Sequence, residues 1–358
     1  MIRFLPLFAL LGCPKTPELP TPVWDETPRL PAPIAGVYAR SPEIPTDVAL
    51  AKFVIDKPWD ASLSGAAAGL ALKLVNEMTH GPGLTRWRVR EALWKAGYPF
   101  PARDARAWTA APDGGPPPQL LAWLDGFPEG DDLGLVRARG HDEDLWVALR
   151  ATPSFEFGRI PRQVPEGGSL ELPAASGATY IVSDANGLVV RGELDSPAQI
   201  ECNIVGEWMV KIVPQSGPAA VLPVYVGMMP PELGLIRDVA SIRTPTDALA
   251  RAESLLREIR GAYGTTPLQR DFALDAGARS LLRGDAGSAE GVRNSLGLPP
   301  EKTTLWQCRG TTIEACFDSV IWEPENRLAL LDERSTLGLA ADLDASGVHL
   351  VGIVSVTH

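Results

Sequence analysis

Apolar residues recur at helical spacing in two separate parts of the chain. In the first part, residues 61–78 are rich in alanine and leucine, and residues 86–96 carry apolar side chains on one face. In the second part, residues 246–263 have an apolar stripe formed by Leu249, Ala252, Leu256, Ile259 and Tyr263. Residues 271–283 show the same spacing, and 120–124 in the first part predicts a further short helix, so the pattern predicts five helices in two groups.

Between these two parts the pattern changes from helical to strand-like. Six short apolar or alternating runs occur there, separated by turn residues: 169–172, 179–182, 188–194, 199–205, 207–213 and 219–226. So many short strands at close spacing predict a compact antiparallel β-sandwich over residues 152–230. Two further apolar runs, 145–149 and 348–356, predict buried strands outside the sandwich.

Two short motifs occur once in each helical part. The pattern Asp-x-x-Leu-x-x-x-Ala begins at Asp60 and again at Asp271, where the aspartate suits a helix N-cap. Leu-Gly-Leu follows at 133–135 and at 337–339, at the same distance before an apolar strand in each case. We interpret this pattern as two copies of one module.

The predicted fold class is α+β. Two α-β-α-type modules, over residues 46–150 and 245–358, flank the small antiparallel β-sandwich. A length of 358 residues is consistent with this division into several domains.

The first thirteen residues indicate export. Arg3 precedes a short apolar run at 4–11, and Leu10-Leu11-Gly12-Cys13 follows. This segment resembles a bacterial lipoprotein signal peptide with its lipobox. The resemblance implies cleavage before Cys13 and acylation of that cysteine, for example with palmitate. A hydrophobic terminus without an export function is the alternative.

Residues 14–45 contain nine prolines and predict an extended tether between a membrane and the first module. Within it, Trp24 has nothing local to pack on and is a candidate for contact with lipid headgroups or a partner. Pro14 stands where an aspartate signals inner-membrane retention in some bacteria. Its presence favours the outer membrane, on its periplasmic or surface face, over the inner membrane.

Composition limits the class of partner. The formal net charge is −11 and no basic stripe occurs, which argues against nucleic-acid binding. No apolar run after the signal segment is long enough to span a bilayer, so lipid on Cys13 is the predicted membrane attachment.

Three further cysteines are expected to meet an oxidising compartment. Cys308 and Cys316 are close enough in sequence for a disulfide that closes a small loop, but the sequence alone does not decide between a bridge and two thiols. Cys202 lies in an alternating run, and we expect a buried free thiol there.

Several segments of the two modules resemble the CAP superfamily of cysteine-rich secretory and pathogenesis-related domains. In the first module, 79–84 with Ala96-Gly97-Tyr98 resembles the family's histidine-containing portion. In the second, 322–327 with Leu330-Leu331-Asp332 resembles its Gly-His-Arg helix, and Leu337-Gly338-Leu339 its final turn. The resemblance implies the family's fold for both modules.

The family's cleft groups two histidines with two acidic residues, and this chain departs from that pattern. The first module keeps at most His80, and Asn326 stands where the family has histidine in the second. His349 and His358 lie at the very end of the chain. The resemblance therefore implies degenerate modules without the family's cleft.

No established catalytic or phosphate-binding motif occurs, so we predict no catalytic residue, no metal site and no cofactor. His141 and Asp184 lie in segments that we interpret as solvated turns. The sequence favours a lipid-anchored envelope protein with a non-enzymatic binding or structural role, whose partner is an envelope protein or a polysaccharide. Two alternatives remain: an envelope hydrolase or peptidoglycan-active enzyme with an unrecognised site, and a carbohydrate- or protein-binding module centred on the sandwich.

Overall fold

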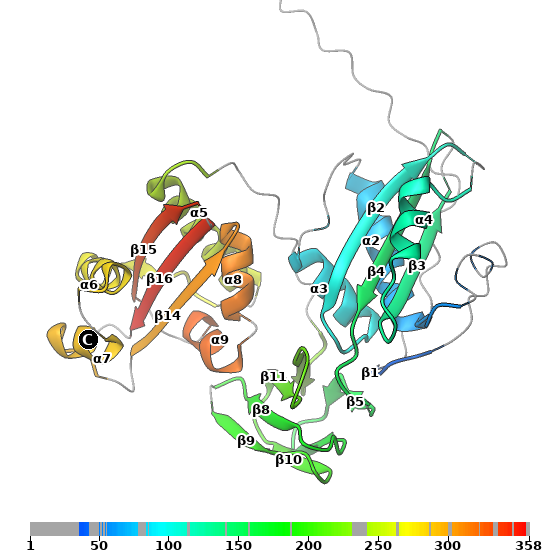
Figure 1. Ribbon diagram of the computed structural model, residues 1–358. Coiled ribbons are helices and arrows are strands. Elements are labelled where there is room, and N and C mark those ends of the chain that lie inside the picture. The colour runs from blue at the N-terminus through cyan, green and yellow to red at the C-terminus, as the bar shows by residue number, and fades with distance from the viewer. Residues whose placement is uncertain are drawn as a thin grey trace, which may run out of the picture.

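The computed structural model describes 36–42, 50, 52, 54, 56–77, 84, 86–112, 115–139, 142–156, 158–186, 188–230, 242–262, 265–285, 288–299, 303–321, 323–331, 336–345 and 347–355 (Figure 1). The predicted signal segment, most of the predicted tether and Trp24 lie outside these residues. Of the helices that are described, none combines the length and the apolar character that crossing a membrane requires.

The first module is a three-stranded sheet with helices on both faces. Its elements are α2 (Ala61–Glu77), α3 (Arg86–Ala96), β2 (Ala102–Ala110), α4 (Pro118–Asp125), β3 (Asp132–Ala138) and β4 (Asp144–Ala151), and the strand order is β2-β4-β3. Side chains alternate along β4: Leu145 and Val147 pack with α2, whereas Trp146 and Ala148 pack with α4. Helices therefore cover both faces of β4, and this coverage explains why the strand is apolar along its length.

The second module repeats this plan with more helices. It contains α5 (Pro245–Ala262), β13 (Gln269–Arg270), α6 (Phe272–Arg283), α7 (Ala289–Ser295), β14 (Thr303–Gly310), α8 (Ile313–Ile321), α9 (Pro324–Leu331), β15 (Thr336–Asp344) and β16 (Gly347–Ser355). The sheet order is β13-β15-β16-β14. Helices α6 and α7 pack on one face of the sheet, and α5, α8 and α9 pack on the other.

The two modules share one register. Leu133 pairs with Arg150 across β3 and β4, and Leu337 pairs with Val354 across β15 and β16, so equivalent leucines pair with residues at the same separation along the chain. The Leu-Gly-Leu segments lie within strands β3 and β15, which corrects the expectation that 337–339 forms a turn. The turn of each hairpin comes later, after the strand has paired along its whole length.

The repeated aspartates cap equivalent helices. The Asp60 carboxylate accepts a hydrogen bond from the Leu63 amide at 2.9 Å, and the Asp271 carboxylate accepts one from the Leu274 amide at 3.1 Å. Burial raises the pKa of the Asp60 carboxyl to about 6, against the hydrogen bonds that it accepts from the amides of Leu63 and Ser41. The two capping residues therefore have the same role, but Asp60 has it in a drier environment.

The central part is the predicted sandwich, built from two unequal sheets. Strand β5 (Ile160–Pro161) precedes it. The strands of its two sheets are β6 (Gln163–Val164), β7 (Gly168–Leu172), β8 (Thr179–Ser183), β9 (Val189–Glu193), β10 (Ala198–Cys202), β11 (Gly206–Val213) and β12 (Ala220–Val226). One sheet has the order β6-β12-β11-β8-β9 and the other pairs β7 with β10. All pairings are antiparallel except that of β6 with β12, and the predicted α+β fold class is confirmed.

The end of the predicted tether belongs to the folded structure. Strand β1 (Val37–Tyr38) pairs with β5, and the buried Tyr38 hydroxyl donates to the Pro223 carbonyl at 2.8 Å. Arg40 forms a two-pronged hydrogen-bonded ion pair with Asp132 of the first module. The range 14–45 was therefore predicted too long as a tether, because Tyr38 and Arg40 find partners that are far away in sequence.

The three parts pack against one another and share one continuous hydrophobic cluster. Figure 1 shows the two modules side by side, with the sandwich beneath both. The Trp94 indole of α3 donates to the Val221 carbonyl of β12 at 2.9 Å. On the other side, Arg327 of α9 forms a buried ion pair with Glu207 of β11. The sandwich thus holds both modules in place.

Candidate functional site

The cysteines predicted from the sequence have distinct positions. Cys308 and Cys316 form a disulfide with their Cα atoms 5.2 Å apart, which ties β14 to α8. Cys202 is buried and free, as expected, and burial raises the pKa of its thiol. Cys13 lies outside the described residues, so its lipidation stays a prediction.

Of the four histidines, the structure describes His349 alone. His80, His141 and His358 lie outside the part of the chain that the structure describes. His349 is on β16, next to Arg309 and Asp342 on the flanking strands. Among the described residues, no group of three or more histidine, cysteine, aspartate or glutamate side chains has the arrangement of a metal site.

Asp184 precedes a turn, as the sequence predicted, but its side chain is buried and not solvated as expected. Its carboxylate accepts hydrogen bonds from the amides of Asn186 and Leu188, each at 2.9 Å. Both contacts are local hydrogen bonds of a turn, and they explain the position of the Asp184 carboxylate.

A pocket opens between the first module and the sandwich. It has a volume of about 650 Å³, within the range of small-molecule sites. Helix α3 and the start of strand β2 form its two sides, and Gly217 and Pro218 of the sandwich close one end. Val89, Leu93 and Pro101 contribute apolar surface. We take this pocket as the candidate functional site.

Three arginines line the pocket. Arg86 and Arg90 are one turn apart on α3, and Arg103 is on β2. Burial lowers the pKa of Arg90, whereas the nearby carboxylates of Asp318 and Glu323 in the second module raise it. Asp318 lies near both helix arginines, with N–O distances of 3.4 Å to Arg86 and 3.6 Å to Arg90.

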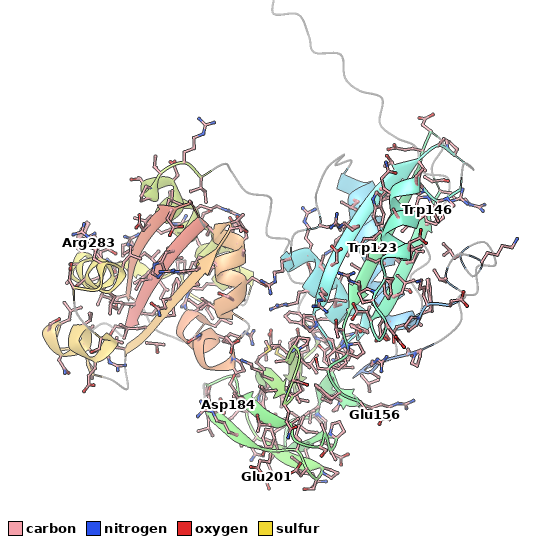
Figure 2. The ribbon with its side chains drawn as sticks, in the orientation of Figure 1. Trp123, Trp146, Glu156, Asp184, Glu201 and Arg283 are labelled. Carbon is pink, nitrogen blue, oxygen red and sulfur yellow. A yellow bond between two sulfur atoms is a disulfide. The ribbon has the colours of Figure 1, made fainter. Side chains whose placement is uncertain are left out.

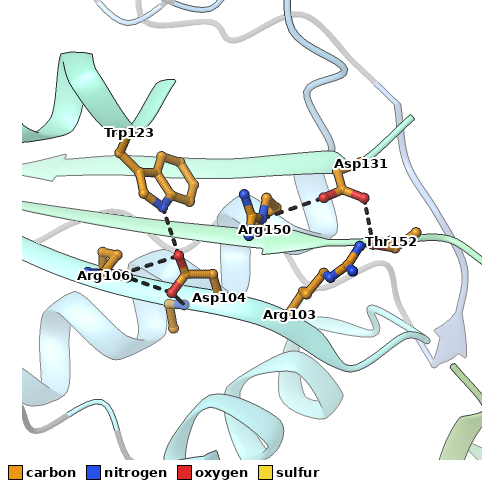
Figure 3. Close-up of polar contacts among 8 residues, drawn as sticks. Arg103, Asp104, Arg106, Trp123, Asp131, Arg150 and Thr152 are labelled. Atoms are coloured by element: carbon orange, nitrogen blue, oxygen red, sulfur yellow. Dashed lines mark hydrogen bonds and ion pairs between the residues drawn. The ribbon is translucent and has the colours of Figure 1, made fainter. Parts of the chain in front are cut away.

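One carboxylate, Asp104, lines the pocket but faces other partners. It accepts hydrogen bonds from the Trp123 indole at 2.9 Å and from Arg106 at 3.0 Å (Figure 3). Partial burial would raise the pKa of Asp104, but these hydrogen bonds hold it below its usual value. The negative charge of Asp104 is thus directed toward Trp123 and Arg106.

A short chain of polar contacts begins at Arg103, on the β2 side of the pocket. Arg103 donates to the Thr152 hydroxyl at 3.3 Å, and Thr152 donates to Asp131 at 2.5 Å (Figure 3). Asp131 is buried and also lies 3.5 Å from the Arg150 guanidinium. This chain connects Arg103 to a buried carboxylate and so restricts where its guanidinium can lie.

The arrangement is suited to binding an anion. Guanidinium groups recognise carboxylates and phosphates through paired N–H donors, and the surrounding apolar walls strengthen such contacts by excluding water. Besides the arginines and apolar side chains, the described lining includes the Asp104 carboxylate and the Thr152 hydroxyl. It offers cationic donors and apolar surface, which are the features of a binding site.

Sequence reasoning did not find this pocket. Residues 86, 89, 90 and 93 share one helix face, so the helix prediction was sufficient to bring Arg86 and Arg90 together. Strand β2 was not predicted, because its residues alternate alanine with charged side chains and lack the usual apolar run. The available signal was the local run of three arginines, Arg86, Arg88 and Arg90, in an otherwise acidic chain.

The solved structures that are similar to this chain include two bacterial proteins. One is an extracellular protein containing an SCP domain from Bacillus anthracis str. Ames, with 12% identity and a TM-score of 0.26; the match covers 33% of this chain and 45% of that one. The other is a cysteine-rich secretory protein from Staphylococcus aureus subsp. aureus Mu50, with 10% identity and a TM-score of 0.27, covering 73% of this chain and 85% of that one.

The chain spans less than half the length of the first of these proteins. The descriptions of these two proteins name an SCP domain and a cysteine-rich secretory protein. At these identities and TM-scores, the similarities do not assign the chain to a family. Neither a protein-family model nor a curated protein sequence matches the chain.

Proposed function

We propose that this chain is a lipid-anchored cell-envelope protein with a non-enzymatic binding role, and that the arginine-lined pocket binds a carboxylate-bearing ligand. The observation that carries the proposal is the set of three arginines around a pocket with apolar walls, in a chain whose net charge is −11. Such a strongly acidic protein repels anions at long range, so a local cationic site provides selectivity for an anion that docks closely.

The two modules are proposed to be degenerate CAP-type domains. The motif resemblance supports this proposal, and so does the equal register of the β3–β4 and β15–β16 hairpins. In this proposal the family's cleft is lost, and the binding surface lies instead where α3 and β2 meet the sandwich.

Binding is tested with acetylated glutamyl-leucine amide, a small probe that carries one carboxylate and one apolar side chain. We expect the purified full chain to bind it, and Arg103→Ala to weaken binding about tenfold through the lost charge-assisted hydrogen bonds. Isothermal titration calorimetry measures both affinities, and added salt is expected to weaken binding.

Two controls accompany this titration. Arg283→Ala removes an exposed arginine at the outer side of the second module, distant from the pocket (Figure 2), and should leave the affinity unchanged. The neutral glutaminyl-leucine amide should bind more weakly than the charged probe. Equal binding of the two probes, or equal losses in Arg103→Ala and Arg283→Ala, would contradict the proposed site.

Anchoring is tested at Cys13. We expect Cys13→Ala to release the protein from the membrane fraction, because the acyl chains would be lost and none of the described helices could span a membrane. Cell fractionation and immunoblotting measure the distribution, with Cys202→Ala as the cysteine control. A Cys13→Ala protein that stays in the membrane fraction would refute lipid attachment at this residue.

A second candidate function concerns the sandwich. Leu188 immediately before edge strand β9 and Val190 within it are exposed, with 67% and 37% of their surface accessible, although β9 also carries Arg191 and Glu193. An apolar, unpaired strand edge can receive a strand from a partner protein. This observation favours a protein-binding role for the sandwich next to the pocket.

A further inference from the structure

An exposed apolar patch lies at one end of the sandwich, where β11 begins and β12 ends. Met228 and Met229 follow β12 and are 38% and 75% exposed, and Val205, just before β11, is 47% exposed. Strands β11 and β12 pair as far as this end, and a Cβ added to Gly227 would lie 3.1 Å from the Val205 side chain. Val205, Met228 and Met229 therefore form one surface, which we call the methionine patch.

The N-terminal segment joins the fold beside this patch. Gly36 is the first described residue, and its carbonyl accepts a hydrogen bond from the Arg162 amide at 2.7 Å. The next residue, Gln163 of β6, donates from its side chain to the Met228 carbonyl at 3.3 Å and to the Met229 sulfur at 3.2 Å. Two neighbouring residues thus connect Gly36 to the methionine patch, and the predicted lipid anchor lies on the N-terminal side of Gly36.

The chemistry of the patch suits the surface of a lipid bilayer. Methionine side chains are apolar and flexible, so they fit the irregular boundary between headgroups and acyl chains. Each exposed apolar side chain gains free energy when it leaves water for that boundary. Three side chains make only a weak contact, but an anchored protein holds its patch at a high local concentration near the bilayer.

The charge beside the patch indicates which headgroups it meets. Glu166 is exposed, and its side chain lies 3.4 Å from the position of an added Cβ on Gly227. The whole chain has a net charge of −11. Anionic headgroups repel such carboxylates, whereas zwitterionic headgroups have no net charge. The patch is therefore suited to a membrane surface of zwitterionic lipids.

We propose that the methionine patch rests on the zwitterionic bilayer in which the lipid anchor is inserted, so that the β11–β12 end of the sandwich faces the membrane. This inference rests on the proposed lipid anchoring, and it adds a second, weaker point of contact. One flexible tether leaves a protein free to rotate, whereas two points of contact restrict its orientation. The patch by itself does not hold the protein on the membrane when the anchor is lost.

Fluorescence quenching tests the contact in the full, acylated chain. Met229→Cys is labelled with a nitrobenzoxadiazole dye, and the protein is reconstituted in phosphatidylcholine vesicles containing lipids with a nitroxide on the acyl chain. The described native cysteines do not compete for the dye, since Cys202 is buried and Cys308 is bonded to Cys316. We expect the nitroxide to remove most of the dye's fluorescence, because position 229 reaches the acyl chains.

Phe272→Cys with the same dye is the matched control. Phe272 is 87% exposed on α6 of the second module, away from the sandwich (Figure 1), and we expect no quenching there. If the protein floats with the vesicles but position 229 is not quenched, or is quenched no more than position 272, the membrane contact is wrong and the anchoring stands. Protein that does not float with the vesicles overturns both.

Two further measurements separate the patch from the dye. Met228→Gln, added to the labelled Met229→Cys chain, is expected to reduce quenching, because the dye loses an apolar neighbour that enters the membrane with it. Unchanged quenching would show that the dye alone drives insertion, which overturns the inference. Phosphatidylglycerol added to the vesicles is also expected to reduce quenching, and unchanged or stronger quenching would overturn the assignment to zwitterionic lipids.

Discussion

Gly134→Ala and Gly338→Ala are each expected to destabilise the protein by about 3 kcal/mol. An added Cβ at Gly134 would lie 2.5 Å from the carbonyl carbon of Leu63, and one at Gly338 would lie 2.2 Å from that of Leu274. Both neighbours are backbone atoms of a helix, so they cannot rotate away. The helix would have to move off the sheet, which would open the packed interface between them.

Chemical denaturation of each variant measures this loss. Gly261→Ala is the matched control, because its Cβ would have no atom within 4 Å and the residue lies in helix α5. It is expected to stabilise the protein by about 0.5 kcal/mol through helix propensity. Losses below about 1 kcal/mol at Gly134 and Gly338 would mean that the helices can shift without cost, contrary to close packing.

Glu207→Ala is expected to cost about 3–5 kcal/mol. Glu207 of β11 forms an ion pair with Arg327 of α9, and their side chains are 7% and 4% exposed. Removing the carboxylate takes the charged partner Glu207 away from a buried guanidinium, so the desolvation cost of that charge is less well offset. Because the pair joins the sandwich to the second module, the loss weakens the contact between them.

Chemical denaturation measures the loss of stability in Glu207→Ala and compares it with the losses in two other variants. Glu207→Gln combined with Arg327→Met removes both charges and should recover most of the lost stability. Glu258→Ala breaks the more exposed pair with Arg251, where Glu258 is 44% exposed, and should cost less than about 1 kcal/mol. A double variant as unstable as Glu207→Ala would show that packing, and not charge burial, sets the cost.

Elements with strong apolar periodicity were predicted well from the sequence. Helices α2, α3, α5 and α6 and the six strands β7–β12 lie where the pattern placed them, with shifts of a few residues at the ends. These elements were predictable because each has one face that must be buried. The spacing of its apolar residues indicates whether a helix or a strand places them all on that face.

Elements with weak or continuous patterns were missed. Strand β2 alternates alanine with arginine and aspartate and so lacks an apolar run. Helix α8 (Ile313–Ile321) is short, and most of its residues are buried, the charged Glu314 and Asp318 among them. Both are held by the sheets and helices that surround them. Their conformation depends on tertiary packing more than on local propensity.

The pocket depends on tertiary packing even more. Arg86 and Arg90 come from one helix, but Arg103, Pro218 and Asp318 come from elements that are distant in sequence. No short motif records that these residues meet. The candidate residues taken from the sequence, such as His80, were identified from the residues next to them in the chain.

By itself, the sequence determined the α+β class, the repeat of the Asp60 and Asp271 caps and the strand-rich centre, because periodicity and capping act over a few neighbouring residues. Only the tertiary structure decided that the two modules pack against the sandwich, that Tyr38 belongs to the core and that three arginines line one pocket. Those outcomes depend on contacts between segments that are far apart along the chain, and their energies are set by burial and charge pairing after the elements have formed.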